Sequence, residues 1–94
     1  MLEIPSLREL EVFRATVFSS SATAAAERLG ISQPSVSRIL ANIEQRMGMI
    51  LFLRQNGRLI PTAEAFALDD ELETVFEGLE SVRHLAAEAD ALRG

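Results

Sequence analysis

The chain has 94 residues, of which 48% are hydrophobic, contains no cysteine and carries a formal net charge of −5. The apolar content is too high for a disordered chain and supports one modest core, so we expect a single small domain or a part of a longer protein. Without cysteine, no disulfide or thiolate metal site can form. No apolar run reaches the ~20 residues of a membrane span, and the N-terminus does not have the pattern of a signal peptide. These features predict a cytoplasmic protein with no membrane contact.

The first 30 residues predict two helices that are separated by a serine-rich break. Ser6 can cap a first helix that runs to about Phe18, and residues 19–21 end it. A second helix then runs from about residue 22 or 23 to Leu29. The expected apolar stripe of the first helix is Leu7, Leu10, Phe13 and Val17. The expected packing residues of the second are Ala25, Ala26 and Leu29.

A short turn joins the second helix to a third, over residues 33–47. Gly30 can adopt the left-handed conformation that ends a helix, and the Ser32 hydroxyl can accept an unpaired N–H at the start of the next one. Ile31 and Val36 occupy the positions of a hydrophobic staple. Pro34 falls in the first turn, where its missing N–H costs nothing. Two helices with so short a connection predict a helix-turn-helix.

The third helix has one apolar and one polar face. The apolar stripe consists of Val36, Leu40, Ile43 and Met47. The opposite face has no carboxylate and offers hydroxyl, amide and guanidinium groups, which bind base edges and phosphates in a major groove. The alternative is an ordinary solvated face, although so acidic a chain would usually place Glu or Asp there. The candidate DNA-binding residues on this helix are Gln33, Pro34, Ser35, Ser37, Arg38 and Asn42.

Residues 49–60 predict a β-hairpin. Residues 49–54 are a strongly apolar strand candidate, Asn56-Gly57 tolerates the positive φ angles of a two-residue turn, and residues 59–60 return as a short strand. A helix-turn-helix followed by a hairpin is a winged helix-turn-helix. Arg54 and Arg58 flank the tip of this wing, where they can reach phosphate or the minor groove. The alternative is that both arginines are merely exposed in a turn.

The charge of the chain is unevenly distributed. Residues 1–60 hold seven Arg and five Glu, a net +2, whereas residues 61–94 hold nine acids and two Arg, a net −7. Within residues 28–60, five Arg stand against Glu44 alone. Positive charge is therefore concentrated around the helix-turn-helix, where phosphate contact requires it, and the acidic end must lie away from DNA.

The remainder of the chain predicts one long helix, capped by Thr62 after Pro61. Its apolar residues recur at alternating spacings of 3 and 4, the pattern of a coiled-coil contact. A helix of roughly 40 Å overhangs a 60-residue body, which favours a second chain over packing on its own domain. Phe66 and Phe76 lie off this seam and are expected to touch the first helix or a second chain. The seam is Ala65, Leu68, Leu72, Val75, Leu79, Val82, Ala86 and Ala89, and we expect dimerisation through Leu68, Leu72, Val75, Leu79, Val82 and Ala86.

The sequence contains no constellation of residues that points to catalysis. His84 is the sole histidine, and the heptad pattern places it on the outer face of the long helix. Acidic pairs such as Asp69-Asp70 lie among other acids on a solvated face, and no glycine-rich phosphate loop is present. We therefore expect no enzyme activity, no cofactor and no metal.

Seven segments, in this order, resemble the N-terminal DNA-binding domain of LysR-type transcriptional regulators: residues 7–13, 25–29, 31–38, 40–44, 47–48, 51–52 with Arg54, and 61–62. The resemblance covers about residues 6–66 and extends more loosely to the end. It implies a linker helix that pairs with a second subunit, usually antiparallel, and a double-stranded DNA target that is an interrupted inverted repeat near a promoter. The base and phosphate contacts of the family would fall on Gln33, Pro34, Ser35, Ser37, Arg38 and a wing arginine.

The sequence departs from the family pattern at four positions. Ser20 and Ala22 replace a frequent Gly and Phe, which leaves the packing before the second helix open. Ala65 stands where Gly is common, and Arg58 lies one place beyond the commonest wing arginine. Residues 57–59 with Pro61-Thr62 are similar to the branch that contains LysR itself and the opine regulators, which hints at an amino-acid-like effector.

Together these features predict a mainly α fold, with a winged helix-turn-helix of three helices and a hairpin over residues 1–61 and a linker helix for dimerisation over residues 62–94. The resemblance implies a homodimer, with a tetramer in the full-length protein, and an effector domain that is missing from these 94 residues, so a small-molecule effector would act only through that domain. The alternative function is a helical protein-interaction module that uses the acidic helix and does not bind DNA.

Overall fold

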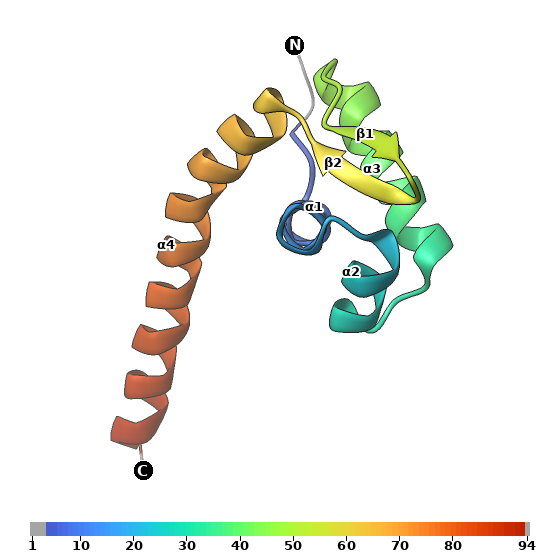
Figure 1. Ribbon diagram of the computed structural model, residues 1–94. Coiled ribbons are helices and arrows are strands. Elements are labelled where there is room, and N and C mark those ends of the chain that lie inside the picture. Colours follow the sequence, from blue (N-terminus) through green and yellow to red (C-terminus); the bar gives the residue numbers. More distant parts are fainter. Residues whose placement is uncertain (1–3, 94) are drawn as a thin grey trace.

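The computed structural model describes residues 4–93, which form four helices and one antiparallel two-stranded sheet (Figure 1). This is the mainly helical winged helix-turn-helix that the sequence predicts. Residues 1–3 and 94 of the expected domain division lie outside the described residues. The elements in chain order are α1 (Leu7–Ser19), α2 (Ala22–Leu29), α3 (Gln33–Met47), β1 (Phe52–Gln55), β2 (Arg58–Pro61) and α4 (Ala63–Arg93).

Local capping explains where the first three helices begin and end. The Ser6 hydroxyl accepts the Glu9 N–H while the Glu9 carboxylate accepts the Ser6 N–H, so α1 begins with a complete capping box. The Ser32 hydroxyl accepts the Ser35 N–H at 3.2 Å and starts α3. Gly30 ends α2 with a φ of 69° in the left-handed region that favours glycine, as the sequence predicts.

Glu9 also ties the beginning of α1 to the end of α3, because its Oε1 accepts from Arg46 Nη1 at 3.1 Å. The backbone N–H of Ser6 is the main cause that lowers the pKa of Glu9 below its ordinary value of 4.5, and Arg46 lowers it further. A carboxyl group whose pKa is lower in the folded than in the unfolded protein stabilises the fold at pH values above its unfolded-state pKa. This contribution is lost as the pH falls through the folded-state pKa. Glu9→Gln should therefore flatten the fall in unfolding free energy between about pH 5 and pH 3, measured by urea titration. A wild-type slope in the variant would contradict this assignment.

The core lies where α1, α2, α3 and the start of α4 meet, with α1 at its centre (Figure 1). Val12 and Phe13 are fully buried, and the Phe13 ring lies 5.7 Å from that of Phe52 between centroids. The expected stripe of α1 is wrong at Leu7, which is 46% exposed. Because α1 is covered by α2 and α3 on one side and by α4 on another, its buried face is wider than one stripe and includes Val12.

The wing is a short hairpin whose register pairs Phe52 with Pro61 and Gln55 with Arg58. Asn56 and Gly57 have φ angles of 52° and 76°, which confirms the predicted two-residue turn. The sequence predicts that the first strand begins at residue 49, but in the structure it begins at Phe52. The preceding backbone is held by other partners, since the Leu51 carbonyl accepts the Thr62 N–H at 3.0 Å outside the sheet.

The turn between α1 and α2 accommodates two of the four departures from the family pattern, Ser20 and Ala22. Ser20 adopts the left-handed conformation with a φ of 55°, and its carbonyl accepts the Leu59 N–H at 3.1 Å. This bond joins β2 to the α1–α2 turn. Ala22 is buried in the core despite its small side chain. The turn therefore serves as an attachment point for the wing.

Helix α4 starts on the body and then runs beyond it (Figure 1). The Thr62 hydroxyl accepts the Ala65 N–H at 3.2 Å and donates to the Ile50 carbonyl at 2.7 Å, so it caps the helix and anchors it. With 31 residues, α4 is about 46 Å long. Within residues 4–93, no helix combines the length and the apolar character that a membrane crossing needs.

Candidate nucleic-acid interface

The polar face of α3 is directed away from the core. Val36, Leu40 and Ile43 are buried and hold the opposite side of the helix against α1 and α2. Among the predicted DNA-binding residues of α3, Ser35 and Ser37 are half-buried, and the remaining four are exposed: Gln33, Pro34, Arg38 and Asn42. The Ser35 hydroxyl accepts from Ser32 Oγ at 2.8 Å and lies 3.5 Å from Arg38 Nη2. The structure therefore presents hydroxyl, amide and guanidinium groups together at the start of α3.

Glu44 explains why this face carries no negative charge. Its Oε2 accepts the backbone N–H of Leu51 at 2.7 Å and that of Phe52 at 3.2 Å. The only acid of α3 is thus turned toward the start of the wing and satisfies two donors there. The sequence predicts Glu44 only as one negative charge and does not predict this role. A lone acid in an otherwise basic segment was the available signal.

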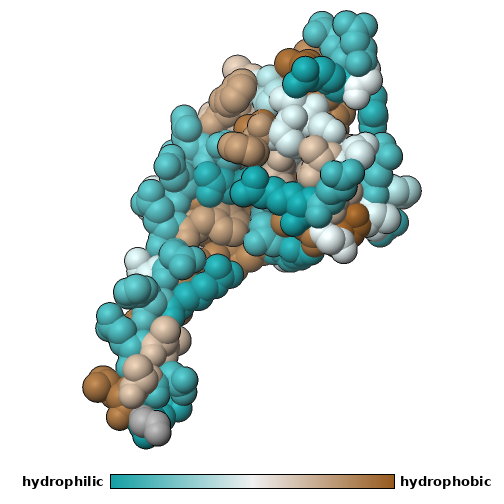
Figure 2. Space-filling view, turned by 60° about the horizontal axis from the view of Figure 1, so that its bottom comes forward, coloured by the Kyte–Doolittle hydropathy of each residue, from teal (hydrophilic) through white to brown (hydrophobic). Residues whose placement is uncertain are grey.

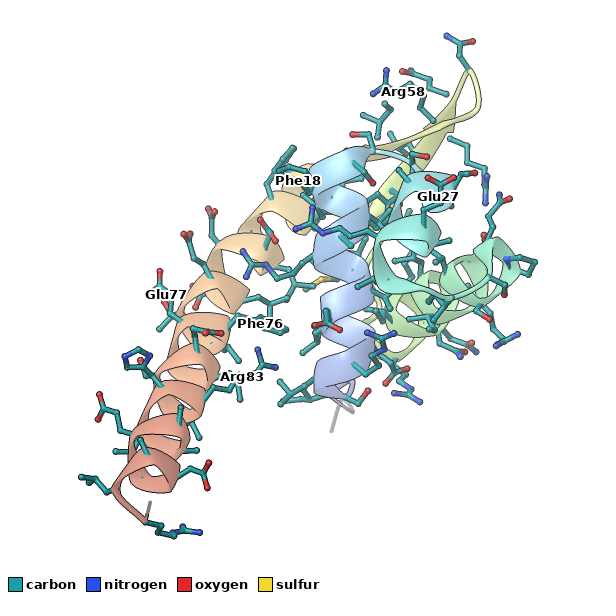
Figure 3. The ribbon with its side chains drawn as sticks, turned by 90° about the horizontal axis from the view of Figure 1, so that it is seen from below. Phe18, Glu27, Arg58, Phe76, Glu77 and Arg83 are labelled. Carbon is teal, nitrogen blue, oxygen red and sulfur yellow. The ribbon has the colours of Figure 1, made fainter. Side chains whose placement is uncertain are left out.

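Arg54 and Arg58 lie on the two strands of the wing, next to its turn, and both side chains are exposed. Within residues 4–93, neither guanidinium makes a hydrogen bond or an ion pair with another residue of the chain. Figure 3 shows Arg58 at the outer end of the wing, far from α4. Two uncompensated positive charges therefore stand at the tip of the wing, where a polyanion could approach them.

The acidic part of the chain lies on the other side of the body. Helix α4 carries the net charge of −7 counted for residues 61–94, and α1 separates it from α3 (Figure 1). The polar face of α3 is therefore not opposed by that negative charge. This arrangement meets the condition, set by the charge distribution, that the acidic end must lie away from any DNA.

The first half of α4 packs on its own chain. Leu72 is only 6% exposed, and Leu68 and Phe76 are half-buried against the same core. Leu72, and Leu68 in part, are thus covered within the single chain, which disfavours these two members of the predicted dimerisation set; the set itself stays a prediction. The packing also places Phe76 on α1, one of the two alternatives left open, whereas Phe66 remains 55% exposed.

From Val75 onward in α4, the large exposed apolar residues form another stripe together with Gly78 and the half-buried Ala89, displaced around the helix from the first. They follow spacings of 3 and 4, and we call them the outer apolar face. Hydrophobic atoms gather at the free end of α4 (Figure 2). Val82 and Leu85 are 62% and 67% exposed, so this face has no cover in a single chain. Ala86 and the half-buried Leu79 lie at its edge. The outer apolar face comprises Val75, Gly78, Val82, Leu85, Ala89 and Leu92.

The expected solvated face of Asp69-Asp70 is wrong at Asp69, whose side chain is 26% exposed because it packs against Arg14, whereas the other titratable side chains of α4 are exposed. His84 is 80% exposed, on the outer surface that the sequence predicts, and its Nε2 lies 3.8 Å from Glu88 Oε1. Among the residues that the structure describes, no group of three or more His, Asp or Glu is placed to hold a metal ion.

Comparison with known proteins places this geometry in a family. The model of the family described as "Bacterial regulatory helix-turn-helix protein, lysR family" matches residues 7–66. The regulator DgcR of Pseudoalteromonas sp is 44% identical over 85% of the chain, and the octopine catabolism/uptake operon regulatory protein OccR of Rhizobium meliloti is 39% identical over 88%. The transcriptional activator LysR of Escherichia coli K12 is 40% identical over 94%. LysR and an octopine regulator are thus both among the relatives, as the predicted branch requires.

These three relatives are longer than the chain, which spans 27–28% of their length. Among solved structures, the CbnR_DBD–DNA complex superimposes with a TM-score of 0.77 at 29% identity, covering 88% of this chain and 98% of that one. The relatives are transcriptional regulators, which agrees with the prediction that the chain is not an enzyme. By the matched domain, its fold and these relatives, the chain belongs to the lysR family of bacterial regulatory helix-turn-helix proteins.

Proposed function

We propose that residues 1–61 are the sequence-specific, double-stranded-DNA-binding domain of a LysR-type transcription regulator, and that residues 62–94 are its linker helix. The observation that carries this proposal is the exposed face of α3, which contains polar and cationic groups and no carboxylate. The structural relative CbnR_DBD was solved with DNA, which supports the same kind of partner here. As in that family, α3 would enter the major groove with its first turns.

The chemistry of the six α3 residues suits base and phosphate contact. Arg38 can bind guanine O6 and N7 with two parallel hydrogen bonds, and the Gln33 or Asn42 amide can pair with adenine in the same way. Ser35 and Ser37 can donate to phosphate oxygens, and the Pro34 ring can touch a thymine methyl group. The wing would add charge contacts from Arg54 and Arg58.

Arg38→Ala and Gln33→Ala should each weaken binding to the preferred sequence by about 1–3 kcal/mol, because each removes a base contact, while the fold remains intact. The preferred sequence is first selected with the wild-type chain from a randomised pool of DNA duplexes. Affinities are then measured by fluorescence anisotropy at two salt concentrations.

Arg83→Ala is the matched control for Arg38→Ala, because it removes an exposed arginine from α4, away from α3. Folded variants of Arg38 and Gln33 that bind like the wild type would refute the assignment of this face. A wild-type chain that selects no sequence and shows no salt-dependent DNA affinity would refute the proposed function itself. The remaining candidate would then be a protein-interaction module, which the exposed apolar and acidic surfaces of α4 favour.

The wing arginines should behave differently from Arg38. Arg54→Ala and Arg58→Ala should lower the affinity for selected and random DNA alike, because phosphate contacts carry no sequence information. Each should also reduce the slope of log affinity against log salt by about one unit. If Arg58 instead enters a narrow A·T minor groove, its loss would relax the preference at one flank of the site. An unchanged slope in both variants would remove the wing from the interface.

Dimerisation is part of the same proposal, and we place it on the outer apolar face, which is uncovered in a single chain. Two copies would cover each other's outer apolar face and bring two α3 helices onto one DNA duplex, about one helical turn or a multiple apart. Such an arrangement suits an interrupted inverted repeat near a promoter. A tetramer, a small-molecule effector bound outside these residues and a cytoplasmic location complete the proposal for the whole protein.

A further inference from the structure

Helix α4 is attached to the rest of the molecule near its start, by contacts with α1, with β2 and with the segment before β1. Its start is fixed by Thr62, and Leu72 packs into the core. Beyond these, the Nε of Arg14 on α1 donates to Asp69 Oδ1 at 2.9 Å. Both side chains are about three-quarters buried, with 29% and 26% exposed. Among residues 4–93, this is the only ion pair that connects α4 to another element.

Arg14 makes a second contact with α4. Its guanidinium carbon lies 5.4 Å from the centroid of the Phe76 ring, within the range of a cation–π interaction. Figure 3 shows Phe76 directed from α4 toward α1. Asp69 and Phe76 are seven residues apart, which is two helical turns or about 10 Å along the axis. We call Arg14, Asp69 and Phe76 the Arg14 clamp.

A contact that spans two turns restrains more than a single point. Thr62 and the apolar packing of Leu72 fix the first turns of α4, and Arg14 adds polar and cation–π contacts on either side of Leu72. Asp69 and Phe76 both face Arg14, so rotation of α4 would separate the guanidinium from at least one of them. The charge-assisted hydrogen bond to Asp69 is the stronger of the two restraints. The clamp therefore fixes the direction in which α4 leaves the body.

Helix α3 is joined to the other side of α1 by an ion pair and by core packing. Glu9 and Arg46 form a 3.1 Å ion pair between α1 and α3, and Phe13 and Ile43 are both fully buried in the shared core. Any change in the angle between α4 and α1 is therefore also a change in the position of α3 relative to α4. The molecule is 32 Å across its second principal axis. We take this length as the order of magnitude of the distance between the clamp and the polar face of α3.

We propose that the Arg14 clamp sets the separation of DNA half-sites that the dimer accepts, a role that rests on the proposed function. A change of about 10° in the direction of α4 moves α3 by roughly 5 Å at this distance, compared with a rise of about 3.4 Å per base pair. Arg14 is then a positioning residue: it touches no DNA, but decides which spacing brings both α3 helices into the groove.

The first test measures the clamp without DNA. Because the chain has no cysteine, Glu27→Cys on α2 and Glu77→Cys on α4 allow two spin labels to be attached at exposed positions (Figure 3). The labelled chain is diluted with unlabelled chain, and the distance distribution within one chain is measured by double electron–electron resonance. Arg14→Met should widen this distribution by about twofold or more, since it keeps the aliphatic stem and removes both restraints.

The second test measures the consequence on DNA. The half-site selected with the wild-type chain is placed in inverted repeats whose spacer changes by single base pairs over one helical turn. We expect the wild type to prefer one spacing sharply. In Arg14→Met, the affinity ratio between the best spacing and a spacing two base pairs longer should fall about fivefold or more. Affinity for a single half-site should stay within about twofold of wild type.

Two further variants keep the test sharp. Asp69→Asn removes the ion pair while leaving Arg14 in place. If Arg14→Met does not fold, the distance distribution and the spacing preference are measured in Asp69→Asn instead. Arg83→Met is the matched control, because the Arg83–Glu80 pair lies within α4 and both side chains are 72% exposed. The control should match the wild type in both measurements.

The outcomes separate this proposal from the one on which it rests. A folded Arg14→Met or Asp69→Asn with an unchanged distance distribution overturns the clamp. A widened distribution with an unchanged spacing preference overturns its role in half-site separation. A wild-type chain that selects no DNA sequence refutes the proposed function and this role together, whereas the distance measurement still shows whether Arg14 directs α4.

Discussion

Val82→Asp should convert the proposed dimer to a monomer at micromolar concentration and lower the affinity for a two-half-site DNA by about 100-fold or more. Val82 is 62% exposed at the middle of the outer apolar face. In a two-fold dimer each substitution occurs twice, so two carboxylates would be buried without partners among apolar side chains. The net charge of −7 on each residue 61–94 segment would add repulsion at low salt.

Sedimentation velocity at moderate salt measures this effect, with DNA affinity measured in parallel. His84→Asp is the control, because it adds the same negative charge to the exposed polar side of α4, away from the outer apolar face. It should remain a dimer. A wild-type chain that is monomeric across the micromolar range would overturn dimerisation through α4 and leave only the winged domain.

Leu72→Ala should lower the free energy of unfolding by about 2–5 kcal/mol, the usual cost of truncating a buried leucine. Leu72 is 6% exposed and packs with α1 in the core of its own chain. The loss should therefore appear in the monomer. We would measure it by urea unfolding in the Val82→Asp background, where association does not contribute to the transition.

The control for this second variant is Leu92→Ala, at a side chain that is 89% exposed. It should change the unfolding free energy of the monomer by less than about 0.5 kcal/mol. If Leu72→Ala left the monomer as stable as its parent and weakened only the dimer, Leu72 would belong to the intermolecular surface, as the heptad pattern first suggested.

The two variants show why a regular apolar repeat is ambiguous. Residues 65–89 give one seam in a 3.5-residue repeat, but a straight helix has 3.6 residues per turn, so the apolar positions drift around its surface. In the structure, Leu68 and Leu72 face α1, whereas Val82 and Leu85 face outward. The pattern indicates that the apolar positions of α4 require cover, both from its own chain and from a partner. It does not indicate which part of the helix each contact covers.

The candidate interface was largely determined by local sequence. Ser6 and Ser32 cap helices through bonds to residues three positions away, and Asn56-Gly57 forms its turn from its own two φ angles. Helical periodicity alone then separates the buried Val36 stripe from the polar face of α3. Features that depend on neighbours within one or two turns can be predicted from sequence, because the chain keeps these residues together in any arrangement of the helices.

Only the tertiary structure decided the contacts that orient these elements. Glu9 meets Arg46 across 37 positions of sequence, and Arg14 meets Asp69 across 55. No periodicity links such pairs, because each depends on how two helices cross. The same limit explains the error at Leu7 and the missed role of Glu44. The sequence determined which helix carries a DNA-reading face and what chemistry it offers, whereas packing around α1 decided where that face points relative to α4, because that angle results from side-chain contacts between distant segments.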